Sequence, residues 1–93
     1  MIIGTITFKI HIPYAHSLKE KRSVVKSIIA KIQNKFNLSV AEIDLQNQWQ
    51  FALIGVAMIA NKTKIIEQQI TRVIEFLDKQ TEFEVIEIKT DIF

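Results

Sequence analysis

The sequence predicts an α+β fold in which two helices cover one face of a four-stranded antiparallel sheet. Two segments carry apolar residues at helical spacing, and four others carry the alternating or continuous apolar pattern of strands. Their order is strand, helix, strand, strand, helix, strand. The 93 residues, 48% of them hydrophobic and 24% charged, suit one soluble domain spanning residues 1–93.

The first strand and the first helix have the clearest patterns. Residues 2–12 alternate between two sets of side chains, as a half-buried strand does, and Pro13, which has no amide donor, ends the pairing. Ser17-Leu18-Lys19-Glu20 matches the capping box S-x-x-E, so the helix is expected to begin near Leu18 and to end at Asn37. Its core-facing stripe comprises Leu18, Val25, Ile28, Ile29, Ile32 and Phe36.

The remaining elements follow in the same way. Residues 38–45 alternate weakly, and the polar stretch 46–48 is a hairpin connection into an apolar strand that ends at Ala60. Asn61 is the expected cap of a second helix, whose apolar residues again recur at three and four. The last strand is expected over residues 83–92.

This order of elements defines the ferredoxin-like, or split βαβ, architecture, which buries both helix stripes on one face of the sheet. Right-handed crossovers then bring three loops to one end of the sheet: residues 13–17, residues 46–48 and the turn near Thr81. The first two turns of the first helix lie at this same end and carry Lys19, Lys21 and Arg22.

The formal charge of +2 hides a strong segregation along the chain. Residues 1–36 hold seven Lys or Arg against a single Glu, a net of +6, whereas residues 37–93 hold five against nine acids, a net of −4. The basic residues are concentrated in the first strand and first helix.

The start of the first helix is the candidate anion-binding or RNA-binding surface. Cations in a first turn oppose the helix macrodipole, and such a local violation often marks function. At about 100° per residue, Lys19, Arg22 and Lys26 lie within about 60° of one another. The alternative is a neutralised surface, because Asp78, Glu82 and Glu84 are expected at the same end. The candidate residues are His16, Lys19, Lys21, Arg22, Lys26 and Trp49.

Trp49 is included because it borders the predicted hairpin, where it could offer a stacking face to a base, with Phe51 two residues further on. The alternative for a lone tryptophan at a strand start is packing at the rim of the core.

The third strand is apolar on both of its faces, although one face of a two-layer sheet should meet water. This pattern predicts a protein partner or a homo-oligomer formed through the open sheet face. The alternative is that the strand tolerates small apolar residues among the polar neighbours Thr5, Thr7 and Lys89.

No pattern indicates catalysis, a cofactor, a metal or a small-molecule substrate. His11 and His16 do not share a helical face, and there is no nucleophile elbow or glycine-rich phosphate loop. The start of the chain does not read as a signal peptide, the longest apolar run is half of a membrane span, and there is no cysteine. A cytoplasmic, non-enzymatic protein that does not bind membranes is expected.

Two blocks, residues 16–27 (HSLKEKRSVVKS) and residues 36–42 (FNLSVAE), closely resemble the YlxP-like family of small uncharacterised bacterial proteins. Trp49-Gln50 and residues 54–57 look like a third block of that family. The resemblance implies a ferredoxin-like cytoplasmic domain without an assigned function. Genes of such proteins commonly lie beside those for transcription elongation, translation initiation and ribosome-binding factors, which implies an RNA or ribosome connection by association. The sequence departs from the family where Asn47 and Phe51 replace a frequent acid and a frequent basic residue.

Overall fold

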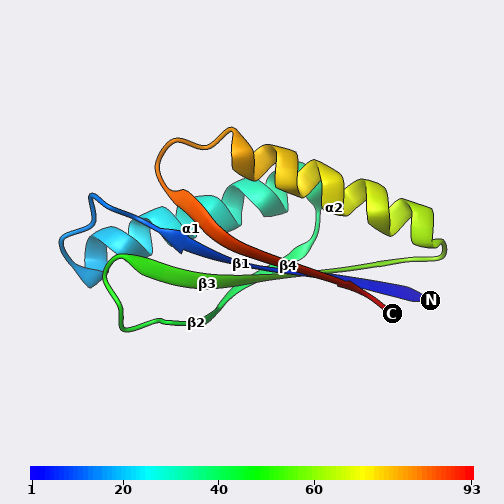
Figure 1. Cartoon of the computed structure of the whole chain (residues 1–93), viewed down its shortest axis with the longest axis horizontal. Helices are drawn as coiled ribbons and strands as arrows, with labels where there is room; N and C mark the ends of the chain where they lie inside the picture. Colours follow the sequence, from blue (N-terminus) through cyan, green and yellow to red (C-terminus); the bar gives the residue numbers. More distant parts are fainter.

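The computed structural model describes all 93 residues and has the predicted order of elements (Figure 1). The strands and helices, in chain order, are β1 Ile2–His11, α1 Leu18–Phe36, β2 Ser39–Asp44, β3 Phe51–Ala60, α2 Thr63–Asp78 and β4 Glu84–Ile92. Neither helix is long and apolar enough to cross a membrane.

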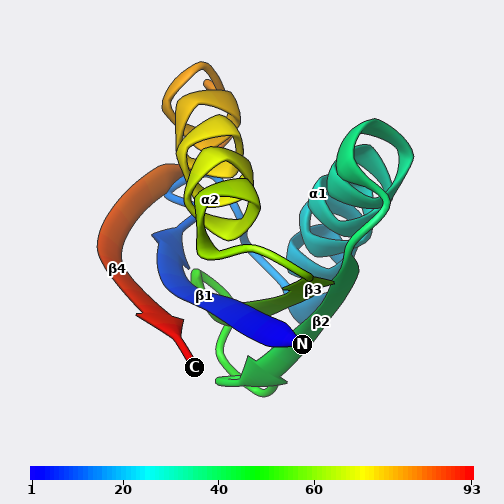
Figure 2. The same cartoon turned by 90° about the vertical axis from the view of Figure 1, so that its right-hand side faces the viewer.

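The sheet has the strand order β2-β3-β1-β4, and every neighbouring pair is antiparallel. Both helices lie on the same side of it, so the other face has no layer over it (Figure 2). The α+β, ferredoxin-like prediction is therefore confirmed. The register of β1 with β4 shifts at a bulge between Lys9 and Ile10, and that of β2 with β3 shifts between Glu42 and Asp44.

Local side-chain contacts define the ends of α1. The Ser17 side chain accepts a hydrogen bond from the Glu20 amide, and the Glu20 carboxylate accepts one from the His16 amide, as the capping box predicts. At the other end, Asn37 adopts a left-handed conformation with φ of 52°. The predicted cap of α2 was wrong: the N-cap is Lys62, whose side chain makes no capping hydrogen bond, and Asn61 lies one residue too early.

The core lies between the helices and the inner face of the sheet. Gly4 in β1 allows the closest approach of α2, because a Cβ atom at this position would overlap Cγ2 of the fully buried Ile66. Gly55 in β3 lies on the opposite, open face, where the nearest side chain is the half-exposed Ile43. The two glycines therefore have different roles.

We expect Gly4→Ala to lower the free energy of unfolding by about 2 kcal/mol, because the stiff Ile66 side chain has no room to move away. The measurement is urea denaturation at equilibrium. Gly55→Ala is the matched control and should change stability by less than about 1 kcal/mol, since Ile43 can shift into solvent. Equal losses in both variants would contradict this assignment.

Candidate functional site

The predicted meeting of loops at one end of the sheet is present, and Gln50 holds two of them together. Its side-chain amide is placed to donate to the carbonyl oxygens of Pro13 and Ala15, both at 3.3 Å, and its own backbone carbonyl accepts from the Ile12 amide. Trp49 and His16 are chain neighbours of these tethered residues, and both are exposed. The β2–β3 loop and the start of α1 thus form one continuous end of the molecule (Figure 1).

Lys21 does not belong to the exposed basic surface that the sequence predicts. Its side chain is completely buried beneath α1, where Nζ donates to the carbonyl oxygen of Leu45 and lies 2.9 Å from Oε2 of Glu42. Lys21 and Glu42 thus form an ion pair in which the lysine side chain is fully buried and the glutamate side chain is 17% exposed. Lys21 therefore connects α1 to β2 instead of facing a ligand.

The other three cations near the start of α1 do share an exposed surface. Lys19, Arg22 and Lys26 are all exposed, and no carboxylate lies within 4.0 Å of their charged nitrogens. We call these three residues the basic stripe. Further along α1, Lys31 pairs with Glu82 at 3.2 Å, and Lys35 lies over the rings of Phe36 and Phe76.

The three acids that were expected to neutralise this surface make no ion pair with the basic stripe. Glu82 contacts Lys31, Glu84 lies 3.4 Å from the ring of His11, and Asp78 has no cation within 4.0 Å. The acid closest in sequence, Glu20, is held by its hydrogen bond from the His16 amide. The basic stripe therefore has no direct counter-charge.

Trp49 is 57% exposed and stacks on no other ring of the protein. Phe51, by contrast, is stacked against His11 with ring centroids 4.9 Å apart, and Lys9 lies over its ring at 5.1 Å. Trp49 thus has a free ring face at this end of the sheet, as does Tyr14, which is 80% exposed, whereas Phe51 already has two partners.

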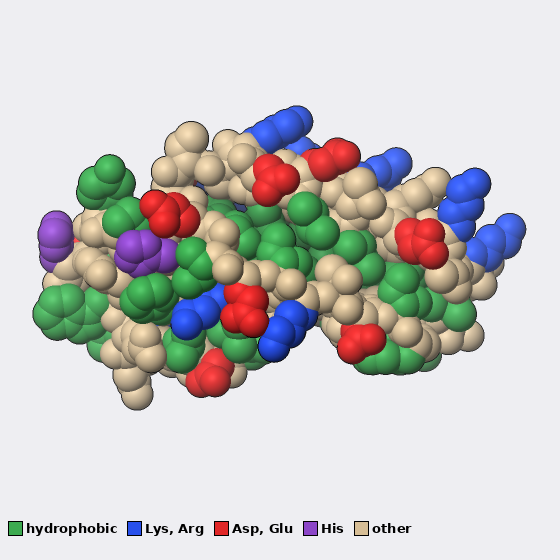
Figure 3. Space-filling model, viewed as in Figure 1, with side chains coloured by type: hydrophobic (Ala, Val, Ile, Leu, Met, Phe, Trp, Pro, Cys, Tyr) green, Lys and Arg blue, Asp and Glu red, His purple; other side chains and the backbone are tan.

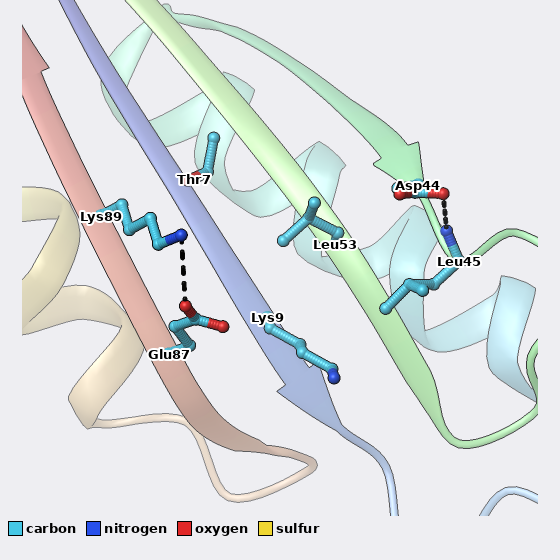
Figure 4. A pocket seen from close by; sticks show the side chains of 7 residues that line it. All are labelled: Thr7, Lys9, Asp44, Leu45, Leu53, Glu87 and Lys89. Carbon is cyan, nitrogen blue, oxygen red and sulfur yellow. Dashed lines mark hydrogen bonds and ion pairs between the residues drawn. The ribbon is translucent and has the colours of Figure 1, made fainter.

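The open face of the sheet has a polar hollow of about 240 Å³ beside β1 and β4 (Figure 4). Two cations, Lys9 and Lys89, line it, but so do the carboxylates of Asp44 and Glu87, and Lys89 pairs with Glu87 at 3.4 Å. Because the acids balance the cations, this hollow attracts an anion less strongly than the basic stripe does.

The structure brings together no group of three His, Asp or Glu side chains that could hold a metal ion. A pocket containing both His16 and Glu42 would have indicated an enzyme. Neither residue lines any of the five main hollows of the surface.

Comparison with known proteins gives one family. The model of a family described as "Protein of unknown function (DUF503)" matches residues 3–90. The chain belongs to the DUF503 family. It is also 40% identical over 79 residues to the "Uncharacterized protein YlxP" of Bacillus subtilis (strain 168), an alignment that covers 85% of this chain and 86% of that protein. The predicted YlxP-like family membership is confirmed.

The buried lysine of this DUF503 protein does have a signal in the sequence. Lys21 follows Leu18 by three residues and precedes Val25 and Ile28 by four and seven, so it occupies a position of the apolar stripe itself. Its place among several cations at a charged helix start conceals this spacing. Its partner Glu42 sits on a strand position paired with the buried Ile54, which is also an inward position.

We expect Lys21→Met to lower the free energy of unfolding by about 3 kcal/mol, because it leaves Glu42 and the Leu45 carbonyl without their partner. Adding Glu42→Leu to this variant should restore more than half of the loss, since no unpaired charge then remains. Urea denaturation of the two single variants and the double variant tests the coupling. Additive losses would show that the two side chains act independently.

Proposed function

We propose that this DUF503 protein is a cytoplasmic accessory protein without catalytic activity, which binds RNA, free or in a ribosomal particle, through the outer side of α1. The observation that supports the proposal most directly is the basic stripe, three exposed cations on one helix side with no carboxylate within reach. Lys and Arg at such positions exchange their counterions for RNA phosphates, and the released ions drive binding.

The capping of α1 refines where an RNA strand would lie. The Glu20 carboxylate stands at the very start of the helix, beside the His16 amide, so a phosphate on the helix axis would meet a negative charge. Phosphates are better accommodated along the outer side, where Lys19, Arg22 and Lys26 are exposed. The contacts are therefore made by side chains rather than by backbone amides.

Trp49 extends the proposed surface beyond the helix. Gln50 ties the segment that carries Trp49 to the loop that leads into α1, which places an exposed ring at the same end as Lys19. An aromatic ring beside cations suits single-stranded RNA, because a base stacks on the ring while phosphates contact the charges.

We expect the triple variant Lys19→Ala, Arg22→Ala, Lys26→Ala to bind a single-stranded oligouridylate at least about tenfold more weakly at low salt. It should also reduce the slope of log affinity against log salt concentration by about 2, because each phosphate contact on a single strand contributes about 0.7. Filter binding across a salt series measures both quantities.

The matched control is the triple variant Lys62→Ala, Lys64→Ala, Arg72→Ala. Like the first variant, it removes two lysines and one arginine, but from exposed positions at the start of α2 and within it. A basic stripe that binds RNA predicts a loss in the first variant only. Equal losses in both would show that net charge alone retains RNA, and no loss in either would refute the proposal.

We expect RNA to quench the intrinsic fluorescence of Trp49, which is the only tryptophan in the chain. Trp49→Ala should weaken oligouridylate binding by about 1–3 kcal/mol, whereas Trp49→Phe should bind nearly as well as the natural protein, since either ring provides a stacking face. Unquenched fluorescence together with full affinity of Trp49→Ala would exclude this side chain from the surface.

A further inference from the structure

The face of the sheet that no helix covers is bulky at one end and hollow in the middle. At the end where the two termini lie, Ile3, Ile59 and Phe93 form an apolar ridge: Ile3 is paired with Ile59, and it exchanges two backbone hydrogen bonds with Phe93. Ile59 is 69% exposed and Phe93 is 64% exposed. We call these three residues the apolar ridge.

Next to the apolar ridge is a groove of about 350 Å³, lined mainly by apolar side chains. We call it the central groove, and its main lining residues are Thr5, Thr7, Ala41, Ile43, Gly55 and Ala57. The groove is hollow because β3 carries only a hydrogen and a methyl group at positions 55 and 57. In the space-filling view, the lower outline of the molecule, which is the open face seen from its edge, is indented between its two ends (Figure 3).

We propose that this open face is an interface between two copies of the chain, related by a twofold axis that crosses β3 at Ala57. The axis lies in the plane of the interface and runs across the strands, so the strands of one copy pack against those of the other, as in a β-sandwich. The two copies bury the same surface, as a twofold interface requires.

The positions along β3 support this particular axis. A half-turn about the axis at Ala57 brings each β3 residue of one copy opposite a β3 residue of the second copy. The two residues lie the same number of positions from Ala57, on opposite sides of it. Ile59 of one copy then lies over Gly55 of the second copy, and the reverse contact is equal. The most exposed apolar side chain of the ridge therefore packs beside Ile43, whose side chain lies next to Gly55, and Ala57 meets Ala57.

The face is large enough for such a dimer. Strands of ten, six, ten and nine residues, at about 3.3 Å per residue and about 4.8 Å between strands, outline about 550 Å² per copy. Two copies would bury about 1,100 Å², which is just above the roughly 1,000 Å² expected of a specific protein interface.

The strong positive charge of α1 does not oppose a second copy as the occupant. The basic stripe lies on the helix layer, on the opposite side of the sheet, so the strongest positive charges of two copies stay apart. On the open face Lys89 is paired with Glu87, so these two charges largely cancel within each chain. Asp91 lies in the same row as Thr5 and Ala57, so the axis brings the two Asp91 carboxylates opposite each other. This like-charge contact opposes the dimer, so added salt should strengthen association.

The first test is the mass in solution, measured by light scattering across a concentration series. The natural protein should show twice the mass of the chain at the upper concentrations. Ile59→Lys should raise the dissociation constant at least about tenfold, because a charge would enter the groove without a partner. Ile65→Lys is the matched control: this isoleucine is also exposed, but it lies on α2, so the dimer should persist.

The second test fixes the axis. The chain has no cysteine, so a single introduced cysteine reports on its own position. A short bismaleimide linker should join two copies of Ala57→Cys but not two copies of Leu53→Cys, whose positions would be about 26 Å apart across the proposed axis. Both variants should retain the far-ultraviolet circular dichroism of the natural protein.

A monomer mass at every concentration would overturn the proposal and leave the face for a different protein. Cross-linking of Leu53→Cys as efficiently as Ala57→Cys would overturn this axis, since an axis parallel to the strands brings both positions near their counterparts. Because the basic stripe lies on the other layer, RNA binding by a monomeric Ile59→Lys protein would separate this inference from the proposed function.

Discussion

The buried ammonium group of Lys21 is the interaction on which the arrangement of the loop end depends. An amine with no contact with solvent must find its partners inside the protein, and both partners here belong to β2 and the residue that follows it. Leu45 adopts a left-handed conformation with φ of 65°, and its amide donates to the Asp44 side chain, a local geometry that presents the Leu45 carbonyl to Lys21. Because Lys21, Val25 and Ile28 are all buried on one side of α1, Lys19, Arg22 and Lys26 face outward.

The fold was predictable because its local signals agree with one another. The alternation of residues 2–12, the capping box at Ser17 and the break in the apolar pattern at Asn37 mark element ends that the structure reproduces almost residue for residue. The misplaced cap at Asn61 shows the limit of propensity, since a good capping residue does not oblige the helix to begin there. Lys21 shows a different limit: its charge suggested solvent, and only the tertiary contact with Glu42 makes its inward position stable.

Part of the candidate site was also predictable, because that part depends only on a local signal. Helical spacing alone brings Lys19, Arg22 and Lys26 to one side, and this needs no knowledge of the rest of the chain. The pairing of acids with these cations depends on the directions of side chains in two layers of the fold. The order of residues in the sequence does not give those directions. Glu82 and Glu84 do lie at the expected end, but they reach Lys31 and His11. The basic stripe and the open sheet face belong to opposite sides of the molecule, so neither surface obstructs the other.

The central position of β1 has a consequence for how the chain folds. The first strand to be synthesised is bonded on one side to β3 and on the other to β4, the last element. Contacts between segments so distant in sequence slow folding, because a long loop must close before they form. The nascent chain therefore carries β1 with one unpaired edge until residues 84–92 have been made, and completion of the sheet is a late event in the life of the newly synthesised protein.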